Sequence, residues 1–290
     1  MTGCLRTLFV AVPVLWVALA NAGPLLAMLR ISLMQVYPGP PGAAPAFSLD
    51  AYASFWQEAG YRASLLRSLG LAAASTAVSL ILAYPLAYYV ARHVPPARRG
   101  RRLMLLIAPF WTSEVLRMFA LVLLLSNRGA LNFVLRWLGL SETPVHLLYG
   151  TGTVLAGMVY TVFLSMLLPL YAAVDRMPAH VLDAAATLGA GAWRRFWRVT
   201  LPLTARGVAS GAVLTYLSAL GVFTAAALLG GVSTLVFATT IADLFGAASG
   251  RWPLGAAFGF ILLTISTACV AGVAALPALF VPDDRPRRDT

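Results

Sequence analysis

Long apolar runs constrain this chain more than any other feature of its sequence. A helix that crosses the hydrocarbon core of a bilayer needs about 20 predominantly apolar residues. Six segments meet this requirement, at about 8–33, 68–91, 103–125, 151–174, 207–230 and 254–281. With 60% hydrophobic and 11% charged residues, the composition also lies outside the range of soluble domains. The sequence therefore predicts an all-α membrane protein with six transmembrane helices.

The positive charge is distributed in a pattern that indicates a membrane rather than nucleic acid as the partner. The formal net charge is +11 and the sequence contains arginine but no lysine. Arginines concentrate in the second and fourth connections between the spans, namely Arg92, Arg98, Arg99, Arg101 and Arg102, then Arg176, Arg194, Arg195, Arg198 and Arg206. Basic residues favour cytoplasmic loops. Both termini, the 175–206 loop and the charged 282–290 tail are thus predicted to lie in the cytoplasm, and we expect no nucleic-acid partner.

The first 34 residues allow two interpretations. Arg6, an apolar run and Ala20-Asn21-Ala22 imitate a cleavable signal peptide. The apolar run continues to Leu33, however, and this length favours an uncleaved first span.

The polar loop at 175–206 has the pattern of two short helices joined at a glycine corner. Pro178 can open a helix, and Gly189 suits a left-handed residue at the helix's carboxyl end. Three aromatic residues of the following segment, Trp193, Phe196 and Trp197, share one helical face, and Pro202 is expected to end that helix. The loop is therefore predicted to form a compact projection that a soluble partner can bind.

This loop resembles the coupling loop of the permease subunits of bacterial binding-protein-dependent ABC importers. The family pattern is EAA, three residues, G, about nine residues, then a hydrophobe, any residue and LP. Here it falls on Asp183, Ala184, Ala185, Gly189, Val199, Leu201 and Pro202, with Asp183 in place of the usual Glu. The resemblance implies a MetI-like type I importer fold and an ATPase-docking loop that includes these residues and Ala190. An interfacial hairpin without a partner is the alternative.

Other motifs resemble the spermidine and putrescine branch of these permeases. They are Tyr-Pro-Leu-Ala-Tyr from Tyr84, Pro-Phe-Trp-Thr-Ser from Pro109 and Trp-Pro-Leu-Gly-Ala-Ala from Trp252. The resemblance implies a multi-pass protein of the bacterial inner membrane. Its implied partners are an ABC ATPase dimer, a second permease subunit in a heterodimer and a periplasmic or lipid-anchored solute-binding protein. A polyamine is the implied solute, although related permeases carry iron, phosphonates or other small solutes.

Several polar residues fall inside the apolar segments and are candidates for a translocation path. They are Trp111, Glu114, Arg117, Tyr160, Thr161 and Asp243. Charged groups in hydrocarbon are costly and need a partner or a water-filled cavity. Glu114 and Arg117 are three residues apart and share a helical face, so they could pair with each other and only fix packing. The sequence leaves both roles open.

The sequence contains no pattern typical of catalysis. A Walker A loop requires a lysine, and the chain has none. Cys4 and Cys269 do not suit a disulfide, and no metal-ligand spacing is present. We therefore expect a non-catalytic transport subunit without a cofactor of its own, ATP and Mg²⁺ being bound by the partner ATPase. A stand-alone secondary carrier with an ion site at Glu114, Arg117 or Asp243 is the competing hypothesis.

Overall fold

The computed structural model describes residues 2–39, 46–231, 234–246 and 250–280 of the chain. Within these ranges the chain is helical, and the one extended pairing is an isolated bridge between Met34 and Phe47. The all-α prediction is confirmed. The predicted 282–290 tail lies outside the described residues.

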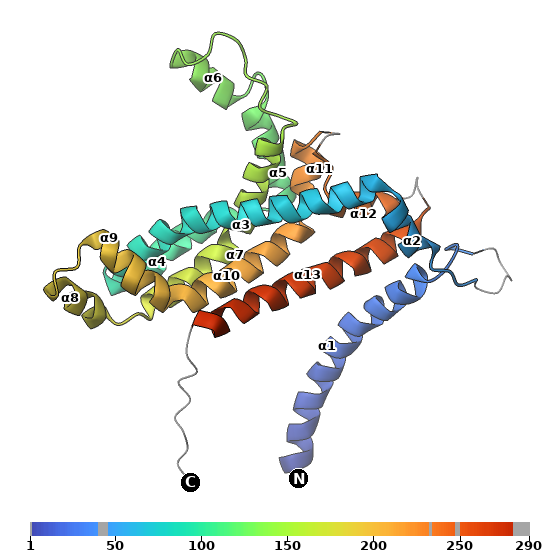
Figure 1. Ribbon diagram of the computed structural model, residues 1–290, viewed down its shortest axis with the longest axis horizontal. Coiled ribbons are helices and arrows are strands. Elements are labelled where there is room, and N and C mark those ends of the chain that lie inside the picture. The colour runs from blue at the N-terminus through green and yellow to red at the C-terminus, as the bar shows by residue number, and fades with distance from the viewer. Residues whose placement is uncertain (1, 40–45, 232–233, 247–249, 281–290) are drawn as a thin grey trace. The chain divides into compact units, whose positions relative to one another are not determined.

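The helices follow one another along the described part of the chain (Figure 1). They are α1 (Thr2–Ser32), α2 (Asp50–Gln57), α3 (Ala59–His93), α4 (Pro96–Ile107), a 3-10 helix (Ala108–Trp111), α5 (Glu114–Leu125), α6 (Ala130–Trp137), α7 (Thr151–Asp175), α8 (Ala179–Thr187), α9 (Ala192–Arg195), a π-helical turn (Phe196–Thr200), α10 (Leu201–Gly221), α11 (Thr224–Leu229), α12 (Phe237–Phe245) and α13 (Trp252–Phe280).

The chain divides into two compact units. Unit 1 comprises residues 1–64 and 240–265, and unit 2 comprises residues 65–239 and 266–290. The boundaries fall within α3, α12 and α13. In unit 1, the ring of Phe55 from α2 contacts the Phe258 ring of α13 with a centroid distance of 5.7 Å. The short helix α2 is therefore packed against α13.

Five helical stretches of the described chain are long and apolar enough to cross a membrane. They are Ala11–Ser32, Ala59–His93, Glu114–Trp137, Thr151–Arg176 and Trp252–Gly272. The predicted span at 207–230 is instead divided between α10 and α11, because the backbone is extended at Val222. The predicted number of six spans is thus approximately matched, with this segment as the exception.

The segment predicted to span at 103–125 is also interrupted. After α4, the 3-10 helix contains Pro109, and the backbone is then extended at Thr112 and Ser113. Proline removes one backbone donor, which weakens helical continuity at this point. A new helix, α5, therefore begins at Glu114, and the charged residues lie at its start rather than in the middle of a span.

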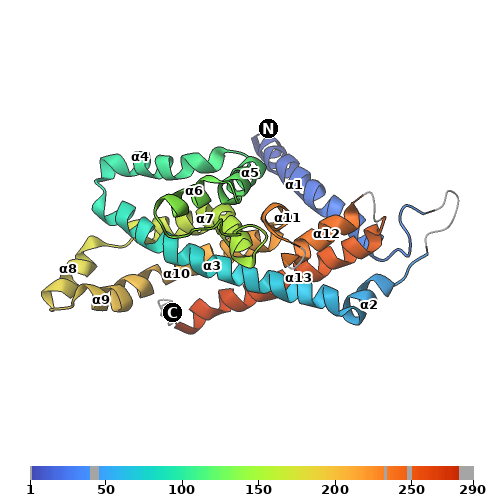
Figure 2. The ribbon, with the colours of Figure 1, turned by 90° about the horizontal axis from the view of Figure 1, so that it is seen from above.

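The core of unit 2 is built where α3, α7 and α10 lie side by side, as both ribbon views show (Figures 1 and 2). Met166, Leu167, Leu170 and Val174 of α7 are fully buried in this cluster. Gly207 and Gly211 of α10 both face the backbone of α7. Small residues permit such approach where lipid supplies no hydrophobic drive for helix association.

Candidate functional site

The first helix of the 175–206 loop ends as its glycine predicts. Gly189 has a φ of +78°, in the left-handed region that glycine adopts without steric cost. The amide of Gly189 donates to the Ala186 carbonyl and that of Ala190 to the Ala185 carbonyl, both at 3.0 Å. These two bonds form a Schellman motif, in which carbonyl groups at the helix end find partners. The chain therefore turns sharply after α8.

The second half of the loop is a continuous helix, and here the prediction that Pro202 ends it is wrong. A π turn at Phe196–Thr200 joins α9 to α10, and the amide of Leu201 donates to the Phe196 carbonyl. In a regular α-helix the Pro202 ring would collide with the carbonyl four residues earlier. The wider turn avoids this collision, so the helix continues from the loop into the core.

The loop exposes apolar and charged side chains. Leu188 is 88% exposed, Trp193 75% and Trp197 51%. Asp183, Ala184 and Ala186 are also exposed, while Ala185 and Ala190 are half-buried. Trp193, Phe196 and Trp197 share one face as predicted, with centroid distances of 5.6 to 6.2 Å. Large apolar groups gathered at an exposed corner are typical of a protein or membrane contact.

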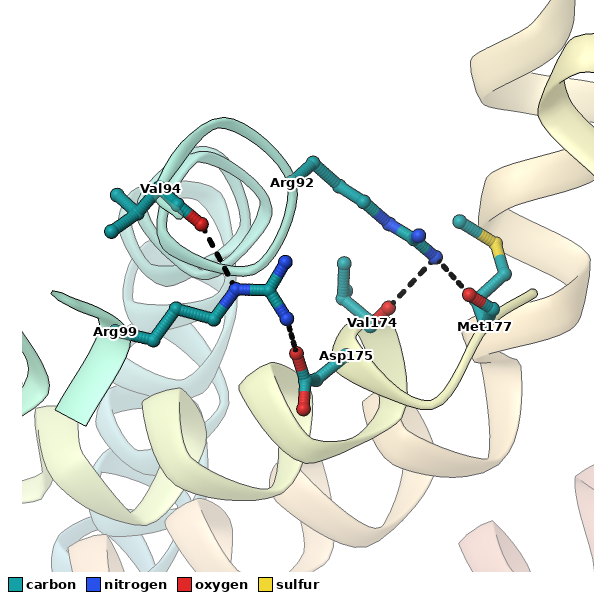
Figure 3. A network of polar contacts seen from close by, with 6 residues as sticks. All are labelled: Arg92, Val94, Arg99, Val174, Asp175 and Met177. Carbon is teal, nitrogen blue, oxygen red and sulfur yellow. Dashed lines mark hydrogen bonds and ion pairs between the residues drawn. The ribbon is translucent and has the colours of Figure 1, made fainter. Parts of the chain in front are cut away.

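Two arginines hold the beginning of this loop, and the sequence analysis did not identify either of them as functional. Arg92 Nη2 donates to the carbonyls of Val174 and Met177 at the end of α7 (Figure 3). Arg99 pairs with Asp175 across 2.7 Å. Their position in an arginine-rich connection indicated only a cytoplasmic loop, because the pattern does not reveal which guanidinium groups turn inward.

A second polar site surrounds Arg117 on α5. The guanidinium carbon lies 5.4 Å from the Phe110 ring centroid and 5.2 Å from that of Tyr160. A cation over an aromatic face is stabilised by the ring quadrupole. The Nε and Nη1 atoms of Arg117 are buried without a protein hydrogen-bond partner. Phe110 is a residue that the sequence analysis missed, although it precedes the predicted Trp111.

The structure does not form the ion pair that the sequence allowed between Glu114 and Arg117. Among the described residues Arg99 pairs with Asp175, and no ion pair joins Glu114 to Arg117. Glu114 occupies the first turn of α5, where a carboxylate complements the helix dipole. Intrahelical pairing is therefore replaced by cation–π contacts for Arg117.

The remaining path candidates occupy different environments. Trp111 is 75% exposed, and Thr161 Oγ1 donates to the Gly157 carbonyl of its own helix at 3.0 Å. Asp243 lies on α12 within unit 1, whereas the others belong to unit 2. Phe110 and Tyr160 line a cavity of about 580 Å³ together with Val78 and Phe163. The structure thus brings Arg117 and Tyr160 together, beside a largely apolar cavity.

No metal centre is built by the described residues. No group of three or more His, Cys, Asp or Glu side chains lies close enough to hold an ion in the described ranges.

Apolar spanning helices and a glycine-capped helical loop between them define a multi-pass membrane protein with a projecting helical loop. Residues 5–277 match the family described as "Binding-protein-dependent transport system inner membrane component". The chain therefore belongs to this family and is a permease subunit of a bacterial ABC importer of the inner membrane.

Individual relatives agree with this assignment. The spermidine/putrescine transport system permease protein PotB of Escherichia coli K12 is 37% identical over 219 residues, which cover 76% of this chain and 78% of PotB. The inner membrane ABC transporter permease protein YdcU of the same organism is 30% identical and covers 92% of this chain and 89% of YdcU. A chain of a bacterial ABC transporter involved in the import of the acidic polysaccharide alginate has the same fold, with a TM-score of 0.78, 19% identity and 96% of both chains covered.

Proposed function

We propose that this permease subunit transports a polyamine, spermidine or putrescine, and that its 175–206 loop docks on a separate ATPase subunit. The 37% identity to PotB, a spermidine/putrescine permease, is the observation that carries the substrate proposal. The exposed corner at Leu188 and Gly189 supports the docking proposal, because it presents apolar side chains on a fixed backbone turn. Family membership favours this function over a stand-alone secondary carrier.

The complete transporter in this proposal contains four further polypeptides. Two ATPase subunits bind ATP with Mg²⁺ at the cytoplasmic face, a second permease completes the path, and an external binding protein delivers the solute. A related fold occurs in a bacterial alginate ABC transporter in complex with an alginate pentasaccharide-bound periplasmic protein. With ATP hydrolysis assigned to the ATPase subunits, this chain carries out no chemical step itself.

Arg117 favours a second candidate, an anionic solute such as a phosphonate. A half-buried guanidinium over two rings occupies the aromatic faces that a polyamine ammonium group would use. A fixed positive charge beside the cavity attracts anions and repels polyamines. Direct measurement of the solute therefore decides between these candidates.

The deciding experiment is affinity purification of the chain in mild detergent from its native host. We expect an ATPase and a second permease to co-purify. The associated binding protein is then titrated with spermidine, putrescine, a phosphonate and iron(III). Binding of a polyamine supports the proposed substrate, and selective binding of a phosphonate or iron overturns it. Recovery of this chain alone, active in ion-driven uptake, would overturn the importer assembly.

Replacement of Glu114 by Gln tests whether this carboxylate lines the path. Loss of the charge removes a helix-dipole interaction of about 0.3–1 kcal/mol, so we expect little loss of protein yield. If Glu114 contacts a cationic solute, uptake falls roughly tenfold, because a charge-assisted contact contributes about 1.5–3 kcal/mol. Radiolabelled spermidine uptake and detergent-solubilised yield are measured together.

The matched control is Glu142→Gln, which makes the same isosteric change at an exposed position outside the helices. This control is expected to transport normally. Reduced yield of Glu114→Gln with unchanged uptake per folded molecule would indicate a purely structural role.

A further inference from the structure

Both ends of the 175–206 loop are attached to the same helix, α3, in unit 2. The beginning of the loop is held by Arg92, the penultimate residue of α3. Its Nη2 atom donates to the Val174 carbonyl at 3.0 Å and to the Met177 carbonyl at 2.5 Å (Figure 3). Carbonyl groups at the end of a helix lack a following turn to pair with, and a cation there also complements the helix dipole. Arg92 is therefore the cap of α7.

A second guanidinium strengthens this attachment from the neighbouring helix. Arg99 of α4 donates through Nε to the Val94 carbonyl at 3.0 Å and through Nη1 to Asp175 Oδ1 at 2.7 Å. The Arg99 and Asp175 side chains are 27% and 36% exposed, so their ion pair alone contributes little stability. Its effect is geometric, since one planar group joins the α3–α4 turn to the last residue of α7.

The end of the loop is attached to α3 through Tyr84. Phe196 of the π turn packs on the Tyr84 ring at a centroid distance of 5.1 Å. The buried Tyr84 hydroxyl forms a 2.8 Å hydrogen bond with Thr204 of α10, whose Oγ1 also donates to the Thr200 carbonyl. Tyr84 and Arg92 are separated by about 12 Å along α3, at a rise of 1.5 Å per residue. One helix thus contacts the loop at both of its ends.

We propose that Arg92, assisted by Arg99, is a positioning residue that makes the 175–206 loop and α3 move as one body. The proposal rests on the proposed docking of this loop on an ATPase subunit. A displacement of α8 would otherwise be absorbed by the three-residue connection at 176–178 before it reached the core. With the Met177 carbonyl held by Arg92, the displacement is delivered to α3 and so to the cavity lined by Val78.

Substitution of Arg92 by Met tests this proposal because it keeps much of the side-chain volume and removes the charge and donors. The complete importer is reconstituted in liposomes with its binding protein, and radiolabelled spermidine uptake and ATP hydrolysis are measured. We expect the ATPase to co-purify at the normal level and uptake per ATP to fall about tenfold. Asp175→Asn, a milder change, is expected to lower it about twofold. Arg101→Ala, an exposed arginine of α4, is the matched control and is expected to behave as wild type.

A solute-independent measurement accompanies the assay. Spin labels are placed at His180→Cys on α8 and Ile81→Cys on α3, both exposed, in a chain whose Cys4 and Cys269 are replaced by Ser. In the assembled importer we expect one distance between the labels that ATP does not change, and a broader distribution in Arg92→Met and Asp175→Asn. A distance that changes with ATP in the otherwise wild-type chain would overturn the proposal, as would normal uptake per ATP in folded Arg92→Met. Failure of the ATPase to co-purify with the wild-type chain would instead overturn the docking function.

Discussion

ATP-driven uptake is expected to fall about tenfold or more in Gly189→Val, while the protein remains inserted in the membrane. Gly189 has a φ of +78°, and the left-handed conformation costs a side chain with a Cβ roughly 1–2 kcal/mol. A cost of 1.4 kcal/mol corresponds to about a tenfold smaller population of the native turn. Loss of this turn removes the bond from Ala190 to Ala185 and redirects Leu188.

Measuring uptake per ATP hydrolysed in the same preparation distinguishes a loss of ATPase docking from a loss of membrane insertion. If α8 docks on the ATPase, Gly189→Val uncouples ATP hydrolysis from uptake or loses the ATPase during purification. Gly191→Val is the matched control, because Gly191 has a φ of −63° and a Cβ there meets no atom within 4 Å. The Cβ at Gly189 is equally free of neighbours, so the two variants differ in backbone conformation rather than in packing. Normal coupled uptake in Gly189→Val would contradict the docking proposal.

The features predicted from the sequence are those that local chemistry determines. The apolar runs predict helices because an unpaired backbone cannot be left in hydrocarbon. Gly189 marks the end of α8 because a left-handed position there favours glycine, and the Trp193, Phe196 and Trp197 face follows from helical spacing. Each of these predictions depends on neighbouring residues along the chain, and the structure confirms the turn and the face.

The features that the sequence could not predict depend on distant neighbours. Spacing made Glu114 the natural partner of Arg117, but the break before α5 brings Phe110 and Tyr160 to the guanidinium instead. Likewise, Pro202 indicated a helix end, whereas the π turn preserves the helix and so connects the loop directly to α10. The inward orientation of Arg92 required α7 to be placed beside α3. The π turn and the orientation of Arg92 concern the elements that join the loop to the core, and the surroundings of Arg117 concern α5. In each case tertiary packing outweighs local preference.

The contact between α7 and α10, through which the loop helix continues into the core, leaves no room for a side chain at Gly207. A Cβ on Gly207 would lie 2.2 Å from the Ala173 Cβ and 3.2 Å from the Pro169 carbonyl oxygen. This carbonyl cannot move easily, because Pro169 lies within α7 and its carbonyl is part of the helix backbone. The helices can accommodate a larger residue only by separating, and this would also displace Met166 from Gly211 one turn away.

Gly207→Val is therefore expected to destabilise unit 2 by at least about 1–3 kcal/mol, the usual cost of overpacking. Thermal unfolding in detergent, followed by the loss of a monodisperse elution peak, measures this effect. Gly70→Val is the matched control in α3, where an added Cβ has no neighbour within 4 Å, and it is expected to unfold at the wild-type temperature. If both variants were equally stable, the two helices would not need glycine to approach, and the α7–α10 contact could not be the rigid link between loop and core. If only Gly207→Val is destabilised, the close contact that continues the loop into the core is a requirement of the fold itself.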